Sequence, residues 1–188
     1  MLNLYKFIEV LVCIQSLIIS TMIPFFITIP FRNIFNYSLE IPVTLQIPTI
    51  IFLSLIFKKK IVLIAFSIYL FLGLFIIPIF HQGGSLGYLL TPNFGYLIGF
   101  YPLINIINLL YKKNKIIIID FLKTGILGIT AMHITGIIYN LIQMIYYKEF
   151  NIFLYNIGTY SLGKIGYHFI MLIPLLFLIK PINYVKYR

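Results

Sequence analysis

Two polar side chains in an otherwise apolar segment of this sequence have the spacing and chemistry of a ligand site. Lys164 and His168 are four residues apart, so on a helix they share one face. The Lys164 ammonium could bind a carboxylate and His168 could donate a hydrogen bond, unless the Lys164 amine instead reaches toward membrane headgroups. Further candidate ligand contacts are Tyr167 in the same segment, Gln46, Tyr96 and Asn140 in other apolar segments, and Tyr88 in a connector.

A glycine-rich connector over residues 81–92 is the second candidate element. It carries Gly83 and Gly84 and ends in Thr91-Pro92. Glycine lets backbone approach a ligand closely, and loops of this kind often carry function. Backbone amides of such a loop can also bind anions. The alternative is a tight turn in solvent.

Two other polar residues have simpler explanations. A hydrogen bond between helices accounts for His133 better than ligand binding does. Asn140 could equally bind a ligand or link two helices.

The residues of several enzyme classes are missing. The four acids alternate between the two predicted sides of the membrane, so no carboxylate pair forms at one depth; they are Glu9, Glu40, Asp120 and Glu149. The sequence has no G-x-S-x-G turn and no P-loop. One cysteine and three scattered histidines form no recognisable metal site. The sequence therefore favours a binding protein or carrier without a cofactor over an enzyme.

The composition indicates which elements must position these residues. Of 188 residues, 61% are hydrophobic and only 10% are charged, and the mean hydropathy is +1.04. A soluble domain has about 25% charged residues, so the lipid bilayer must be the main solvent. The formal charge of +10 comes from lysines clustered in short connectors, which indicates membrane topology and not nucleic-acid binding. We predict one transmembrane domain over residues 1–188.

Six apolar segments can form the spanning helices of an all-α, polytopic membrane protein. Most come near the roughly 17–25 residues that a bilayer requires, although the second is short and the fifth is long enough to tilt or protrude. Pro42 and Pro48 predict an irregular entry to the second segment, and Pro174 predicts a kink in the sixth. The segments are Phe7–Pro30, Val43–Phe57, Ile61–Ile79, Phe94–Tyr111, Ile116–Tyr146 and Ile157–Ile179.

The lysine clusters predict that both chain ends lie on the inner side. The clusters fall at the two ends and in the second and fourth connectors, which share one side of a six-helix chain; they are Lys6, Lys58–Lys60, Lys112/Lys113/Lys115 and Lys186 with Arg188. Basic residues favour the inner side. The glycine-rich connector and the candidate ligand contacts then gather at the outer side, around one cavity.

Three consecutive stretches resemble one known family. Residues 41–46 (IPVTLQ) resemble the entry to the second helix of the BioY family, and residues 73–80 (GLFIIPIF) resemble the end of its third helix. Residues 81–100 (HQGGSLGYLLTPNFGYLIGF) resemble its glycine-rich loop and the following helix, most closely in cyanobacterial and plastid-type members. Together these stretches cover about a third of the chain.

The resemblance implies an S component, the substrate-capture subunit of an energy-coupling factor (ECF) transporter. Such a subunit binds its vitamin, here biotin, from outside and works with a membrane scaffold subunit and paired ATPases. The host membrane would be a bacterial plasma membrane or a plastid membrane. Many family members carry an Asp-x-x-Lys pair at the outer start of helix six, whereas this chain reads Gly163-Lys164-Ile165-Gly166-Tyr167-His168. An S component for another vitamin and a structural subunit without a ligand remain the alternatives.

Overall fold

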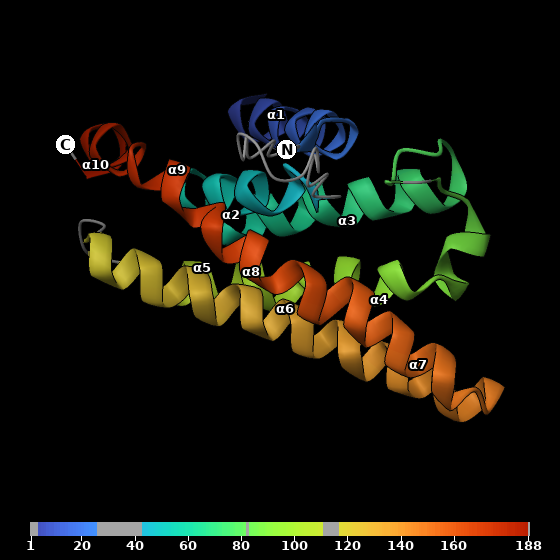
Figure 1. The fold of residues 1–188 in the computed structure, drawn as a ribbon. Coiled ribbons are helices and arrows are strands. Elements are labelled where there is room, and N and C mark those ends of the chain that lie inside the picture. Colours follow the sequence, from blue (N-terminus) through green and yellow to red (C-terminus); the bar gives the residue numbers. More distant parts are fainter. Residues whose placement is uncertain (1–3, 26–42, 82, 111–116, 188) are drawn as a thin grey trace, which may run out of the picture.

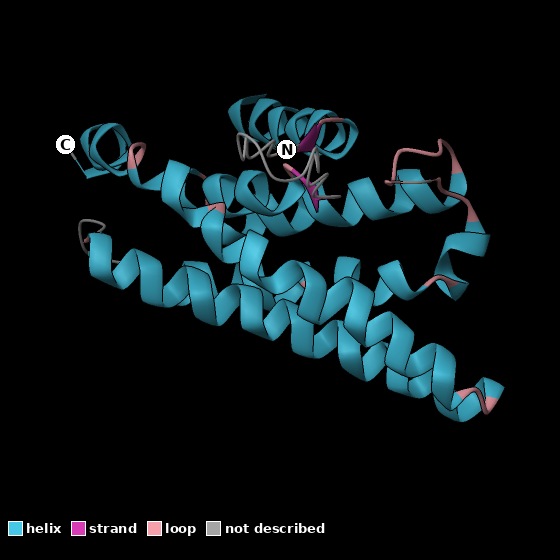
Figure 2. Cartoon of the chain, in the orientation of Figure 1, coloured by secondary structure: helices cyan, strands magenta, loops and turns pink. Residues whose placement is uncertain are grey.

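The computed structural model describes residues 4–25, 43–81, 83–110 and 117–187. Most of these residues are helical, and the others form one short strand pair and the loops between the helices (Figure 2). The predictions for Glu40, Pro42, Lys112, Lys113, Lys115 and Arg188 lie outside the described residues. The elements are α1 (Leu4–Met22), β1 (Pro24–Phe25), β2 (Val43–Thr44), α2 (Gln46–Ile56), α3 (Lys59–Phe75), the 3₁₀ helix η1 (Leu86–Leu90), α4 (Pro92–Ile98), α5 (Phe100–Leu110), α6 (Ile118–Tyr147), α7 (Phe150–Asn156), the π-helix η2 (Ile157–Leu162), α8 (Gly163–Ile170), α9 (Leu172–Leu176) and α10 (Ile179–Tyr187).

The helices pack as a layered bundle. In Figure 1, α2 and α3 run through the middle, with α1 on one side and α6 with α8 on the other. The α4 and α5 helices pack along α6, and α1 packs along α3. One buried apolar core joins these layers, with Leu17, Ile50, Phe66, Leu103 and Ile129 fully enclosed. The all-α membrane fold predicted from the sequence is therefore confirmed.

Three described helices are long and apolar enough to cross a membrane: Leu4–Met22, Pro92–Leu110 and Ile118–Tyr147. At about 1.5 Å per residue, the 30 residues of α6 extend about 45 Å, beyond the roughly 30 Å hydrocarbon core. This helix can therefore tilt or protrude, as its sequence predicts. The count of six spans and the inner position of both ends stay predictions.

Proline accounts for the irregular points of the bundle. The second predicted segment starts as extended chain at Val43–Thr44, paired antiparallel with Pro24–Phe25, before α2 begins at Gln46. The fourth segment is interrupted at Gly99, where Pro102 has no N–H to donate to the Ile98 carbonyl. Similarly, α8 ends at Ile170. Pro174, four residues later, has no N–H to donate to the Ile170 carbonyl.

Several predicted boundaries were wrong. The first helix ends at Met22 and not at Pro30, and strand β1 follows it at Pro24–Phe25.

Two later boundaries also differ. The third helix ends at Phe75 and not at Ile79, and its last carbonyls accept from turn residues after Phe75. The sixth helical segment starts at Phe150, seven residues before the predicted Ile157. Residues 150–156 form α7. Only Lys148, with φ of 58°, and Glu149 separate this helix from α6.

Glycines allow α4 and α6 to pack closely. A Cβ at Gly99 would lie 2.6 Å from the Met132 carbonyl oxygen, and a Cβ at Gly136 would lie 2.3 Å from the Tyr96 ring. Neither approach is possible with a side chain, so these two glycines fix the distance between the helices. This contact places Tyr96 of α4 against His133 of α6, with ring centroids 5.6 Å apart.

Candidate functional site

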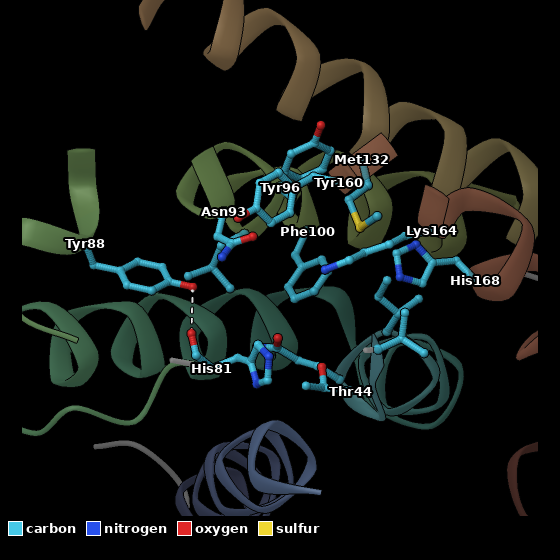
Figure 3. A pocket seen from close by; sticks show the side chains of 14 residues that line it. Thr44, His81, Tyr88, Asn93, Tyr96, Phe100, Met132, Tyr160, Lys164 and His168 are labelled. Carbon is cyan, nitrogen blue, oxygen red and sulfur yellow. Dashed lines mark hydrogen bonds between the residues drawn. The ribbon is translucent and has the colours of Figure 1, made fainter. Parts of the chain in front are cut away.

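The cavity between α2, α4, α6 and α8 collects most of the predicted ligand contacts (Figure 3). Of the residues predicted from the sequence, those lining it are Gln46, Tyr88, Tyr96, Lys164 and His168. An apolar wall of Val43, Ile47, Leu97, Phe100 and Met132 completes it. A few polar groups on an apolar wall are the usual composition of a small-molecule site.

The Lys164 side chain extends from α8 into this cavity (Figure 3). Its ammonium nitrogen lies 4.9 Å from the centre of the Tyr160 ring, one turn earlier in the helix. Such a cation–π contact holds the amine without neutralising its charge. Lys164 has no acidic partner among the described residues, and its charge is therefore available to an anionic ligand group.

The glycine-rich loop, which is the connector over residues 81–92 and is described except at residue 82, closes one end of the cavity through His81 and Tyr88. Gly83, with φ of 143°, bridges back to Phe80, and the Ser85 amide donates to the Gly73 carbonyl at 2.9 Å. A Cβ at Gly84 would lie 2.4 Å from Pro78 Cα, so this turn tolerates no side chain there. The loop is thus a folded structure held against the end of α3.

Tyr88 anchors the loop from within. Its ring is buried and lies 4.8 Å from that of Phe80, and its hydroxyl donates to the His81 carbonyl at 3.3 Å. Two side chains of α6 also hold the loop, because Tyr139 donates to the Leu89 carbonyl and Gln143 donates to the Leu90 carbonyl. These contacts make the loop a fixed wall of the cavity.

Gln46 is oriented by a buried hydrogen-bond group. Its side-chain amide donates to the Tyr69 hydroxyl at 3.1 Å, and the same hydroxyl lies 3.0 Å from that of Thr21. Tyr69 is fully enclosed and Gln46 is 7% exposed. This contact leaves the Gln46 carbonyl oxygen as the acceptor that it can offer to the cavity.

Changing Tyr69 to Phe tests that arrangement. The variant removes the acceptor of a buried amide, which costs about 1–3 kcal/mol in desolvation, and it frees the Gln46 side chain to turn. We expect roughly three- to ten-fold weaker ligand binding by calorimetry. Tyr101→Phe is the matched control, because it removes a hydroxyl that bonds Ser67 outside the cavity. Equal affinities for both variants would contradict a role for Tyr69 in placing Gln46.

Four predicted residues do not line this cavity. Gly83 and Gly84 shape the loop behind Tyr88. Asn140 links two helices, donating to the Gly136 carbonyl of its own helix and, at 3.5 Å, to that of Pro92 in α4. Tyr167 packs against Val43 and Met171.

The structure adds four polar residues that the sequence did not single out. Tyr160 contributes its ring beside Lys164, Asn93 enters from the first turn of α4, His81 enters from the loop and Thr44 enters from β2. Burial and the positive charge of Lys164 lower the pKa of His81 below its usual value, which keeps its imidazole neutral at pH 7. The spacing of four residues between Tyr160 and Lys164 was the one signal in the sequence that could have identified the first of these.

His133 makes hydrogen bonds to neighbouring elements, as predicted. Its Nδ1 lies 3.2 Å from the Ser161 hydroxyl and its Nε2 lies 2.9 Å from His168 Nδ1. His133 is itself 2% exposed. It therefore supports the cavity wall from behind.

The cavity has a volume of about 100 Å³, below the roughly 300–1,000 Å³ of drug-sized ligand sites. A vitamin-sized ligand therefore requires some lining side chains to move. The long, unbranched chains of Lys164 and Met132 are the ones best able to do so.

Comparison with known proteins agrees with this architecture. The structure resembles the crystal structure, at 2.1 Å, of the S-component for biotin from an ECF-type ABC transporter, with a TM-score of 0.65 and 16% sequence identity over 98% of this chain and 92% of the other. No curated protein sequence matches the chain. The sequence profile of the BioY family matches residues 3–175. The chain therefore belongs to the BioY family.

Proposed function

We propose that this protein is the S component of an ECF-type transporter and captures biotin from the outer side of the membrane. The observation that carries the proposal is the BioY family match over residues 3–175. Family membership makes the chain a transporter component and not an enzyme. The S-component fold, shared with a biotin S component, supports the same assignment.

The cavity offers each group that biotin requires. The Lys164 ammonium meets the carboxylate, which is a charge-assisted contact. The apolar wall around Phe100 and Met132 accommodates the thiophane ring and the aliphatic chain. The ureido ring needs both donors and acceptors, which Gln46, Asn93 and His168 can supply.

Calorimetry on the purified protein tests the ligand assignment directly. We expect biotin to bind with submicromolar affinity and to raise the thermal midpoint, because a ligand that binds only the folded state stabilises it. Binding of a different vitamin in place of biotin would change the ligand and keep the S-component role. The absence of heat and of a thermal shift with biotin would reject the ligand assignment.

The six-helix topology belongs to the same proposal, with 1–188 as one transmembrane domain and both ends inside. It rests on the lysine clusters at residues 58–60 and elsewhere. In this arrangement the glycine-rich loop faces outward and the ligand enters from outside.

Cysteine labelling tests the orientation. We expect a membrane-impermeant maleimide to label Leu86→Cys from outside and Lys60→Cys only after permeabilisation. Both positions are exposed, and Cys13, the native thiol, is fully buried and can be changed to Ala. Labelling of both positions from one side would refute the orientation.

The partners and the host membrane follow from the assigned role. A scaffold membrane subunit and paired ATPases would supply the energy for release inward. The host membrane is that of a bacterial cell or, if the gene is plastid-borne, of a plastid.

A further inference from the structure

A continuous chain of buried hydrogen bonds runs behind the cavity wall. The Tyr96 hydroxyl lies 2.8 Å from that of Ser161, and the Ser161 hydroxyl lies 3.2 Å from His133 Nδ1. His133 Nε2 then lies 2.9 Å from His168 Nδ1. The chain thus crosses four elements: α4, η2, α6 and α8.

The two ends of this chain meet the same cavity. Tyr96 and His168 both line it, whereas Ser161 and His133 in the middle are 3% and 2% exposed. Among the described residues, no protein atom hydrogen-bonds to His168 Nε2. At this end of the hydrogen-bond chain, Nε2 is therefore the atom that can bind a ligand.

The protons of this chain can be arranged in two ways. In the first, Tyr96 donates to Ser161, Ser161 donates to His133 Nδ1, and His133 Nε2–H donates to His168 Nδ1. A neutral His168 then carries its proton on Nε2 and presents a donor to the cavity, while the Tyr96 oxygen keeps a free lone pair.

In the second arrangement every hydrogen bond is reversed. His168 Nδ1–H donates to His133, His133 Nδ1–H donates to Ser161, and Ser161 donates to Tyr96. His168 Nε2 is now an acceptor and the Tyr96 hydroxyl is free to donate. Each arrangement therefore gives the cavity one donor and one acceptor, at opposite ends of the chain.

We propose that Tyr96, Ser161, His133 and His168 form a reversible hydrogen-bond relay, which takes the proton arrangement that complements the ligand. The relay thereby selects a neutral cyclic urea or amide over a charged ring. This inference rests on the proposed function, because it concerns the recognition of the ureido ring. Satisfying one donor and one acceptor at once avoids leaving either group buried and unpaired, which is the main source of discrimination in polar sites. His133 and Ser161 are positioning residues, since they act through His168 and Tyr96.

Nitrogen NMR of the histidine rings reads the relay directly. The chain contains three histidines, so ¹⁵N-histidine labelling gives a spectrum that single substitutions can assign. With biotin bound, we expect His133 and His168 each to show one neutral tautomer, and the same one. A mixture of tautomers or an imidazolium ring in the biotin complex would overturn the relay.

Ser161→Ala tests whether the relay determines selectivity. The ligand pair is biotin and 2-iminobiotin, which has the same shape but carries a cationic ring without an acceptor at neutral pH. Because the relay then lacks its link to Tyr96, we expect biotin to bind roughly ten-fold more weakly and the preference for biotin over 2-iminobiotin to fall by a similar factor. Unchanged preference would overturn the relay.

Two further variants keep this test decisive. Ser54→Ala is the matched control, because it removes a buried hydroxyl that bonds only the Ile50 carbonyl of its own helix. If Ser161→Ala does not fold, Tyr96→Phe breaks the same hydrogen bond between Tyr96 and Ser161. Biotin binding to the unmodified protein separates the two ideas: binding without a single tautomer rejects the relay alone, and no binding rejects both.

Discussion

Replacing Lys164 with alanine is expected to weaken biotin binding by roughly thirty-fold, while biotinamide loses little. Truncating one member of a buried charge pair costs about 2–5 kcal/mol, and the lower end applies because Lys164 is only half-buried. Biotinamide has no carboxylate, so it never gains that contact. Calorimetry with both ligands on both proteins measures the difference.

Two controls separate charge from packing. Lys164→Met keeps most of the side-chain length against Tyr160 and removes only the charge, so it should behave like Lys164→Ala toward biotin. Lys180→Ala removes an exposed lysine from α10 and should leave both affinities unchanged. Equal losses of biotin and biotinamide in Lys164→Ala would exclude the carboxylate contact.

Changing Gly99 to alanine is expected to lower the thermal midpoint by roughly 5 °C and to weaken biotin binding. The new Cβ would lie 2.6 Å from the Met132 carbonyl oxygen and 2.9 Å from Met132 Cα. The main chain of α6 cannot move aside as a flexible side chain can, so α4 and α6 must separate. Overpacking of this kind costs about 1–3 kcal/mol, or about 2–4 °C per kcal/mol at this chain length.

The expected loss of binding has a specific cause. Separating α4 from α6 moves Tyr96, which lines the cavity, away from His133, which supports the cavity wall from behind. Gly166→Ala is the matched control, because a Cβ there meets nothing within 4 Å. Thermal midpoints that are the same for the two variants would show that the close approach of α4 and α6 is not needed for stability.

The helical fold could be predicted because the bilayer imposes a simple rule. Long apolar segments such as Ile118–Tyr147 must satisfy their backbone hydrogen bonds internally, and only helices do so within one segment. Proline positions such as Pro174 also indicate where a helix is interrupted. The start of the sixth segment at Phe150 was missed because nothing in hydropathy separates a helix end from a short apolar connector.

For the site, the sequence could predict only how deep in the membrane each candidate residue lies. Ordering residues along each helix brought Gln46, Tyr96 and Lys164 to one level, and the structure places all three around one cavity. The rotation of each helix about its own axis is set by packing, which hydropathy does not report. For that reason Tyr167, at the same depth as Lys164, packs against Val43 and not into the cavity.

The π-helical turn at Ile157–Leu162 determines which residues of the last long helix the cavity receives. Its backbone bond from the Gly163 amide to the Gly158 carbonyl spans five residues, one more than an α-helical turn. Each residue of an α-helix advances the side-chain direction by about 100°, so a chain lacking one residue in this turn would direct Lys164 and His168 elsewhere. Sequence alignments made without a gap at this turn will therefore compare side chains that point in different directions.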